Sequence, residues 1–384
     1  MKFSAIVIFL MLTINCKEKS ENENSFRSLS YSEESTSSEV LPSFVILSKK
    51  EMNHQGRVEF LNDGTIGLIN PGALVTFNFS GNICEVKLKG TSSTYNYVSF
   101  ELDGKHLGRV KIVGNTFKPY TIVIPDTNNI HTLKIIKETE ASDGSVVFGG
   151  VKVKKMEPIK ISSKKYIEFI GNSITCGAAS DSSVLPCEDG EYFDHQNVYN
   201  AYGPKLARAL DVDYMLSSVS GIGIYRDWND ENIEKPIMLQ VYENLYLNTD
   251  ESKKYDFSKK PDIVSICLGT NDFSNGDGIK PRLPFNKELF ISNYIKLIEM
   301  VYSHYPNTKI VMLNSPMISG EINDLFISYL KEIQSYMETN FNKTIPIIKF
   351  NNLYVNGCLS HPSVEEHGKM AVELEPFFHD LLEN

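Results

Sequence analysis

The second half of the chain alternates between short apolar runs and longer segments with helical periodicity. The apolar runs are typical of buried strands and cover residues 166–170, 212–217, 262–269, 309–314 and 345–350. The helical segments cover residues 198–210, 287–305, 323–341 and 364–382. Strands that alternate with helices usually pair in parallel, with helices packed on both faces of the sheet. The sequence therefore predicts an α/β domain with a parallel sheet over residues 159–384.

The first half has a different pattern. From residue 50 to about residue 155, short runs rich in Val, Ile, Phe and Thr are separated by turn sequences such as Asp103-Gly104 and Asp143-Gly144. Closely spaced strands without helical periodicity predict a β-sandwich. We therefore expect a β-sandwich domain over residues 50–158.

Length and charge limit the classes of partner. The chain has 384 residues, which exceeds one typical core and agrees with two domains. Its net charge is −10, and no basic stripe interrupts the acidic composition. Such a protein is poorly suited to binding nucleic acid, so we expect no nucleic-acid partner and favour neutral substrates.

The N-terminus has the features of an export signal. Lys2 precedes an apolar run over residues 5–12, which is too short to remain as a membrane span. Cys16 follows directly, and residues 1–16 resemble a bacterial lipoprotein signal in which Cys16 is lipidated after cleavage. Asn15 departs from the small residues of that pattern, and ordinary secretion is the alternative.

The Ser- and Glu-rich stretch after Cys16 cannot build a core, and we expect a flexible tether over residues 17–49. The predicted location is the bacterial cell envelope, periplasmic or at the cell surface. The predicted membrane contact is the N-terminal lipid.

The six cysteines show no spacing typical of a zinc site, and we predict no metal. If Cys16 carries a lipid, five remain and at least one is unpaired. Cys267 lies in an apolar run and is expected to be a buried thiol. A disulfide among the others is compatible with export, but the sequence does not assign it.

Polar residues follow four of the five predicted strands at the edge where parallel strands present their carboxyl ends. Ligands bind at this edge in open α/β sheets. The four groups are Ser173 after the first strand, 220–223 after the second, 269–272 after the third, and His361 after the fifth. Each group, taken alone, could instead be a turn, helix-cap or surface residue. Their joint position predicts one shared cleft.

These residue types match the needs of acyl transfer, which are a nucleophile, a base and donors to an oxyanion. Ser173 would attack, and His361 would accept its proton. The backbone N–H groups of Ser173 and Gly221 and the side-chain amide of Asn271 would donate to the oxyanion. We expect Asp272 to hold its loop and His367 to make a structural hydrogen bond. His195 is a weaker candidate for lining the cleft.

The ordered sequences GNSIT, SGIG, GTND and HPS resemble the four blocks of the SGNH, or GDSL-type, esterases and lipases. The resemblance implies a flavodoxin-like domain with Ser173 as nucleophile, His361 as base, and Gly221 and Asn271 in the oxyanion hole. Over residues 54–380 the chain also resembles carbohydrate esterase family 2. That family joins a jelly roll to an SGNH domain and removes acetyl groups from plant polysaccharides such as xylan.

Three positions depart from these patterns. Asn172 replaces the usual acid before the serine, although it can still accept a hydrogen bond. Cys358 stands where an acid usually precedes the histidine, and Ser360 stands where family 2 enzymes have tryptophan. Trp228 and Tyr225 are the candidates to contact sugar instead, and a packing role for either stays open.

No acid lies between Asn351 and Pro362, so we predict a Ser173–His361 dyad. A backbone carbonyl before His361, with that of Cys358 as the candidate, would orient the base. Glu365 and Glu366 are expected to point away from it.

The resemblance implies a serine esterase that removes acetyl groups from carbohydrates without metal or organic cofactor. Alternatives are an esterase of cell-wall glycan or lipid, and a glycan-binding module that has lost catalysis. The sequence leaves the oligomeric state open.

Overall fold

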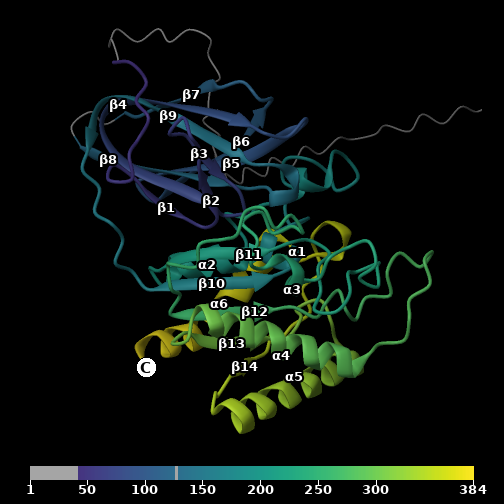
Figure 1. Cartoon of the computed structure of the whole chain (residues 1–384). Helices are drawn as coiled ribbons and strands as arrows, with labels where there is room; N and C mark the ends of the chain where they lie inside the picture. Colours follow the sequence, from purple (N-terminus) through teal and green to yellow (C-terminus); the bar gives the residue numbers. More distant parts are fainter. Residues whose placement is uncertain (1–41, 126–128) are drawn as a thin grey trace, which may run out of the picture.

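The computed structural model describes residues 42–125 and 129–384 (Figure 1). The predicted signal segment, Cys16 and residues 17–41 of the predicted tether lie outside these residues. The end of the predicted tether is corrected, because Val45 pairs with Val151 and Leu47 is buried in the core of the β domain. The described part contains an antiparallel β domain followed by an α/β domain with a parallel sheet, as the sequence predicts.

The first domain is built from nine strands in one hydrogen-bonded network. They are β1 (Asn53–Gln55), β2 (Val58–Phe60), β3 (Ile66–Leu68), β4 (Leu74–Gly90), β5 (Tyr95–Leu102), β6 (Lys105–Val113), β7 (Lys118–Val123), β8 (Ile130–Lys137) and β9 (Val146–Glu157). The short 3-10 helix η1 (Ala141–Asp143) lies between β8 and β9. All the pairings are antiparallel.

The long strand β4 organises this domain. Its first half pairs with β8 over residues 74–80, and its second half pairs with β7 over residues 83–88. Inward-facing side chains such as Phe77, Phe79 and Leu88 join one apolar core. Aromatic and β-branched residues suit the pleated, half-buried surface of a strand, which explains the sequence pattern.

The second domain begins at β10. Its strands are β10 (Tyr166–Gly171), β11 (Asp213–Ser218), β12 (Ile263–Cys267), β13 (Lys309–Leu313) and β14 (Ile347–Ile348). Its α-helices are α1 (Ser173–Cys176), α2 (Tyr202–Ala209), α3 (Met238–Val241), α4 (Lys287–His304), α5 (Gly320–Phe341) and α6 (Val364–Glu383), and η2 (Tyr192–His195) and η3 (Cys358–Ser360) are 3-10 turns. The strands pair in parallel in the order β11-β10-β12-β13-β14. This is the flavodoxin-like order.

Helices cover both faces of the parallel sheet (Figure 1). Helices α2 and α6 pack on one face through residues such as Leu206 and Leu374. Helices α4 and α5 pack on the other through residues such as Leu297 and Leu330. The predicted strands and long helices are therefore confirmed within a few residues at their ends.

The two domains share buried contacts. Leu74 and Ile136 of the β domain belong to the same apolar cluster as helices α2 and α6. Arg57 is fully buried and donates hydrogen bonds to the backbone carbonyls of Tyr242 and Asn244 in the α/β domain.

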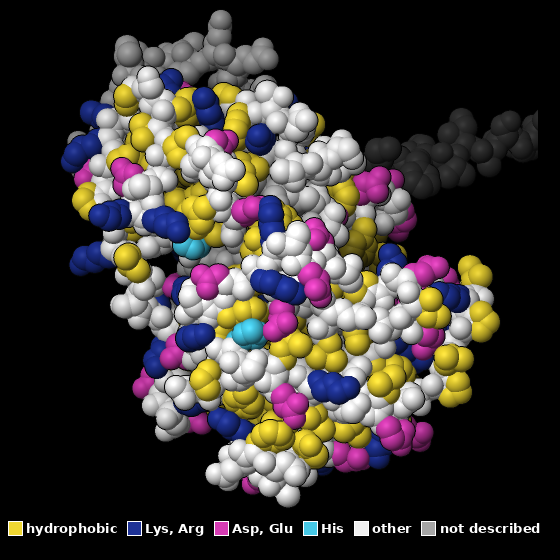
Figure 2. All heavy atoms as spheres, in the orientation of Figure 1, with side chains coloured by type: hydrophobic (Ala, Val, Ile, Leu, Met, Phe, Trp, Pro, Cys, Tyr) yellow, Lys and Arg dark blue, Asp and Glu magenta, His cyan; other side chains and the backbone are white. Residues whose placement is uncertain are grey.

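On the face of the α/β domain shown in Figure 2, acidic and basic side chains are interspersed.

Candidate active site

Ser173 sits where β10 ends and α1 begins. The side chain of Asn172 accepts a hydrogen bond from the backbone N–H of Ile174 at 3.1 Å and caps the turn. Asparagine is a favoured N-cap residue, so the replacement of the usual acid leaves this support in place. The side chain of Ser173 is thereby held at the carboxyl end of the sheet.

The structure brings His361 to this serine. His361 Nε2 lies 2.9 Å from Ser173 Oγ, and Nδ1 lies 3.1 Å from the backbone carbonyl oxygen of Leu359. A carbonyl can only accept, so Nδ1 carries the proton and Nε2 is free to accept from the serine hydroxyl. Burial lowers the pKa of His361, which favours the neutral imidazole that can accept the serine proton.

The carbonyl that lies 3.1 Å from His361 Nδ1 belongs to Leu359, one residue after the candidate Cys358. The carbonyl of Cys358 accepts the backbone N–H of His361 at 3.0 Å, and both carbonyls favour the protonated form of the imidazole. Leu359 and Ser360 both have positive φ, +53° and +57°, which turns the Leu359 carbonyl toward the imidazole. Two consecutive left-handed residues without glycine leave no recognisable signal in the sequence, so the sequence located the turn but not the Leu359 carbonyl.

Among the residues that the structure describes, no carboxylate makes a hydrogen bond to His361. Glu365 is exposed and pairs with Lys369 at 2.8 Å. Glu366 is buried, and its carboxylate accepts from the backbone N–H groups of Asn356 and Ser363. The arrangement at His361 is a dyad supported by a backbone carbonyl.

Three donors are available for an oxyanion. The backbone N–H groups of Ser173 and Gly221 have no acceptor among the residues that the structure describes. Asn271 Nδ2 donates one hydrogen to the carbonyl of Ile222 at 2.8 Å. An amide nitrogen carries two hydrogens, so a second remains for a ligand.

Gly221 is required for its conformation and for space. Its φ is +79°, and a Cβ at this position would lie 2.8 Å from Asp227 Oδ2 and 2.9 Å from Trp228 Cδ1. Asp272 fixes the following segment, because its carboxylate accepts from the backbone N–H groups of Ile224 and Tyr225 at 3.0 Å and 2.8 Å. Burial raises the pKa of Asp272 to about 6.

The two predicted sugar-contact residues differ in position. Trp228 is 43% exposed and its ring edge lies against Gly221. Tyr225 is only 6% exposed, its hydroxyl accepts from the backbone N–H of Asn286, and its ring packs against Phe285. The burial of Tyr225 therefore favours the packing role that the sequence left open for it.

Two features near the base were not identified from the sequence. The Tyr192 ring lies edge-on to His361 at a centroid distance of 6.3 Å, and its hydroxyl lies 3.4 Å from Ser220 Oγ. A disulfide joins Cys187 to Cys358, one residue before Leu359. Both depend on a loop that folds back over the sheet edge, and no local pattern marks such contacts.

Three other cysteines and two other histidines have buried or hydrogen-bonded positions. Cys267 is buried as predicted, and Cys84 and Cys176 are also buried thiols. The two nitrogens of His195 lie 3.2 Å and 2.8 Å from the backbone carbonyls of Asp181 and Asp189. His367 accepts from the backbone N–H of Tyr202, and burial lowers its pKa to about 3.

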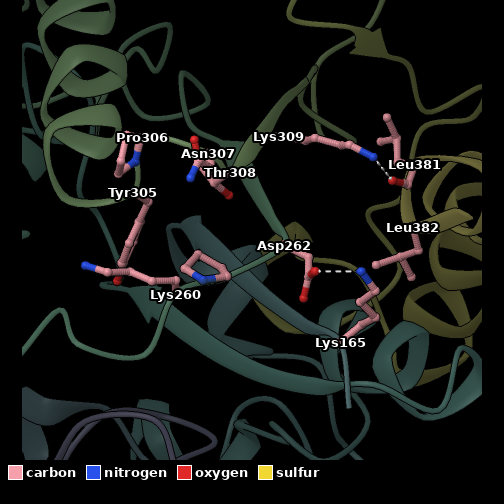
Figure 3. A pocket seen from close by; sticks show the side chains of 11 residues that line it. Lys165, Lys260, Asp262, Tyr305, Pro306, Asn307, Thr308, Lys309, Leu381 and Leu382 are labelled. Carbon is pink, nitrogen blue, oxygen red and sulfur yellow. Dashed lines mark hydrogen bonds and ion pairs between the residues drawn. The ribbon is translucent and has the colours of Figure 1, made fainter. Parts of the chain in front are cut away.

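A separate pocket of about 400 Å³ opens at the opposite, amino-terminal edge of the sheet (Figure 3). Lys165, Lys260 and Lys309 line it, but each ammonium group already contacts Asp262 or a backbone carbonyl. The pocket lies at the amino-terminal ends of the strands, whereas Ser173 follows the carboxyl end of β10. It is therefore distinct from the candidate active site.

Within residues 42–125 and 129–384, no group of three or more His, Cys, Asp or Glu side chains could hold a metal ion. None of the helices in that part of the chain combines the length and apolar character needed to cross a membrane.

Comparison with known proteins agrees with this geometry. Residues 54–160 match the family described as carbohydrate esterase 2 N-terminal, and residues 169–339 match the GDSL-like lipase/acylhydrolase family. An acetylxylan esterase/glucomannan deacetylase of Cellvibrio japonicus is 27% identical over 306 residues, which are 77% of this chain and 83% of that protein.

The cellulase/esterase CelE of Acetivibrio thermocellus is 29% identical over 333 residues, which are 84% of this chain and 38% of that protein. Among solved structures, a family two carbohydrate esterase from Clostridium thermocellum in complex with cellohexaose has a TM-score of 0.77 and 26% identity. That match covers 86% of this chain and 99% of the other.

Proposed function

Because the chain joins a carbohydrate esterase 2 N-terminal domain to a GDSL-like hydrolase domain and so belongs to carbohydrate esterase family 2, we propose that it removes acetyl groups from carbohydrate hydroxyls. The observation that carries the proposal is the 2.9 Å contact between His361 Nε2 and Ser173 Oγ. It is supported by the unpaired N–H groups of Ser173 and Gly221 beside it.

The reaction follows from these groups. Ser173 Oγ attacks the acetyl carbonyl carbon while its proton passes to His361 Nε2. The oxyanion accepts hydrogen bonds from Ser173 N–H, Gly221 N–H and the Asn271 amide, and each such donor contributes about 3 kcal/mol to the transition state.

The imidazolium then gives its proton to the sugar oxygen as that oxygen leaves. Water attacks the acetyl-enzyme with His361 again as base, and acetate is released. The Leu359 carbonyl holds the required tautomer of His361 through both half-reactions.

The relatives support a neutral polysaccharide as substrate. The Cellvibrio japonicus relative carries the name acetylxylan esterase/glucomannan deacetylase, and the Clostridium thermocellum structure holds cellohexaose. In this chain the exposed Trp228 ring beside Gly221 is the aromatic surface on which a sugar would rest.

The test is acetate release from a panel of acetylated xylan, acetylated glucomannan, O-acetylated peptidoglycan and a phospholipid. We expect release from xylan or glucomannan and little from the other two. Release from peptidoglycan or phospholipid alone would replace the proposed substrate class. A panel without any release, with chromogenic acetate also intact, would remove the proposed activity.

We also propose that the enzyme is a cell-envelope lipoprotein, lipidated at Cys16, with the residues from 17 up to the start of the β domain near Val45 as a tether. The support is the apolar run that ends at Cys16. Stable anchoring needs more than one acyl chain. Labelled fatty acid should attach to the native protein and not to a Cys16→Ser variant, and an unlabelled native protein would leave ordinary secretion as the explanation.

A further inference from the structure

The β domain places a buried carboxylate beneath the candidate active site. Glu140 lies between β8 and η1 and is 5% exposed. Its Oε2 accepts the backbone N–H of Ser220 at 2.7 Å, and its Oε1 makes a short hydrogen bond with the Ser220 hydroxyl. Ser220 directly precedes Gly221, whose N–H is a proposed oxyanion donor.

Glu140 is itself held in place by its own domain. Its backbone N–H donates to Asp143 Oδ2 at 3.0 Å, and its carbonyl accepts from Lys137 Nζ at 2.8 Å. Lys137 is fully buried at the end of β8 and also donates to the carbonyl of Thr139. The carboxylate is therefore presented from a fixed turn and not from a mobile side chain on a surface.

Ser220 connects this carboxylate to the rest of the site. The Tyr192 hydroxyl lies 3.4 Å from Ser220 Oγ, and the Tyr192 ring lies against His361. On the other side, Cys176 of α1 donates to Ser218 Oγ at 3.1 Å, two residues before Ser220. The segment 218–221 is thus bounded by α1, by the loop with Tyr192 and by the β domain.

We propose that Glu140 is a positioning residue for the oxyanion hole, through which the β domain holds Ser220 and so aims the N–H of Gly221. The inference rests on the proposed function, because it assigns Gly221 to the oxyanion. It gives the β domain a part in the rate of the reaction in addition to any contact with the polysaccharide.

The Ser220 N–H is a partly buried donor whose acceptor is the Glu140 carboxylate. When its carboxylate partner is removed, the Ser220 N–H must find another acceptor, and the neighbouring Gly221 moves with it. An oxyanion donor acts only when it points at the position that the oxyanion will occupy, and loss of one donor lowers kcat by about 10²–10³-fold. Ground-state binding of the substrate does not depend on this donor, so KM should change little.

Glu138 provides a matched control, because it also joins the β domain to the α/β domain. It is fully buried, and its carboxylate accepts the backbone N–H groups of Val198 and Tyr199 in the α/β domain at 2.5 Å and 3.2 Å. It therefore makes the same kind of contact between the domains, but to a segment without an oxyanion donor. Loss of domain contact alone should affect the Glu138 and Glu140 variants alike.

The experiment compares Glu140→Ala, Glu140→Gln and Glu138→Ala in the full chain with 4-nitrophenyl acetate, together with thermal unfolding of each. Glu140→Ala should lower kcat about 100-fold with KM within about threefold of the native value. Glutamine keeps an acceptor for the Ser220 N–H, and burial already raises the pKa of Glu140, so Glu140→Gln should keep kcat within about tenfold. Glu138→Ala should lose stability but keep kcat within about threefold.

Equal losses of kcat in Glu138→Ala and Glu140→Ala, or a native kcat in Glu140→Ala, would overturn the inference. If Glu140→Ala does not fold, Glu140→Asp replaces it, because the shorter side chain withdraws the carboxylate from Ser220 and should lower kcat in the same way. A native kcat in Glu140→Asp would equally reject the inference. Failure of the proposed function would instead appear as an inactive native enzyme.

Discussion

His361 Nε2 lies 2.9 Å from Ser173 Oγ although 188 residues separate the two in the chain. The contact exists because β10 and the segment after β14 end at the same edge of the parallel sheet. Its orientation comes from the Leu359 carbonyl, which holds the other imidazole nitrogen without a full negative charge.

The first prediction concerns the dyad. Glu365→Ala and Glu366→Ala should lower kcat far less than His361→Ala, because neither carboxylate reaches His361. Glu366→Ala should also cost about 1 kcal/mol of stability, since Glu366 belongs to the capping box of α6. Steady-state kinetics and thermal unfolding measure both effects. A loss in either variant equal to that of His361→Ala, with folding intact, would reveal a third catalytic member.

The second prediction concerns pH. The base must be neutral to accept the serine proton, so kcat/KM should be low in acid, rise through the pKa of His361 and then level off. Burial is the largest influence and lowers that pKa from its usual 6.5. A profile of kcat/KM between about pH 4 and pH 8 should therefore have its midpoint below 6.5. A midpoint above 6.5 would indicate a nearby negative charge that stabilises the imidazolium.

The third prediction concerns Trp228. Its exposed ring beside Gly221 should contact the polysaccharide, so Trp228→Ala should raise KM for acetylated polysaccharide about tenfold, equivalent to about 1.4 kcal/mol. Turnover of 4-nitrophenyl acetate, which lacks a sugar, should change by less than about threefold.

Tyr225→Phe serves as the control for this measurement. It removes a buried hydroxyl that accepts from the backbone N–H of Asn286, so it should cost about 1 kcal/mol of stability and leave KM unchanged. A larger rise of KM in Tyr225→Phe than in Trp228→Ala would restore Tyr225 as the sugar contact.

The fourth prediction concerns the disulfide between Cys187 and Cys358. The bridge ties the turn that carries Leu359 to the loop before Tyr192, and removal of a native disulfide costs about 2–5 kcal/mol. Cys187→Ser should lower both the Tm and kcat, because the Leu359 carbonyl is then less firmly held. A thiol reductant should lower the Tm of the native enzyme and leave that of the variant unchanged. If the reductant lowered the Tm of the native enzyme and of Cys187→Ser equally, the disulfide would not be what stabilises this turn.

The fold was predictable because its periodicity is strong. Buried apolar residues recur at helical spacing along α4, α5 and α6, so the sequence pattern and the tertiary packing agree. The positions of Ser173, Gly221, Asn271 and His361 followed from the rule that parallel strands present their carboxyl ends at one edge. The distance between the nucleophile and base agrees with that expectation.

The supporting contacts were not predictable in the same way. The Leu359 carbonyl depends on positive φ at two residues that rarely adopt it, and Tyr192 and Glu140 reach Ser220 across 28 and 80 residues. Such contacts arise from how loops and domains meet, which leaves no periodic trace. The sequence left the role of Tyr225 open for a related reason, because an aromatic residue after a strand can face the core or the solvent equally well.

Hydrolysis of 4-nitrophenyl acetate by Ser173→Ala beside the native enzyme tests directly whether Ser173 is the nucleophile. Ser173 is buried and alanine is smaller, so the variant should fold with a Tm close to the native value. Without the nucleophile, kcat should fall by at least about 10⁴-fold, and mass spectrometry should detect no acetyl-enzyme. Turnover within about tenfold of the native value, in a folded variant, would contradict the assignment of Ser173 as the nucleophile.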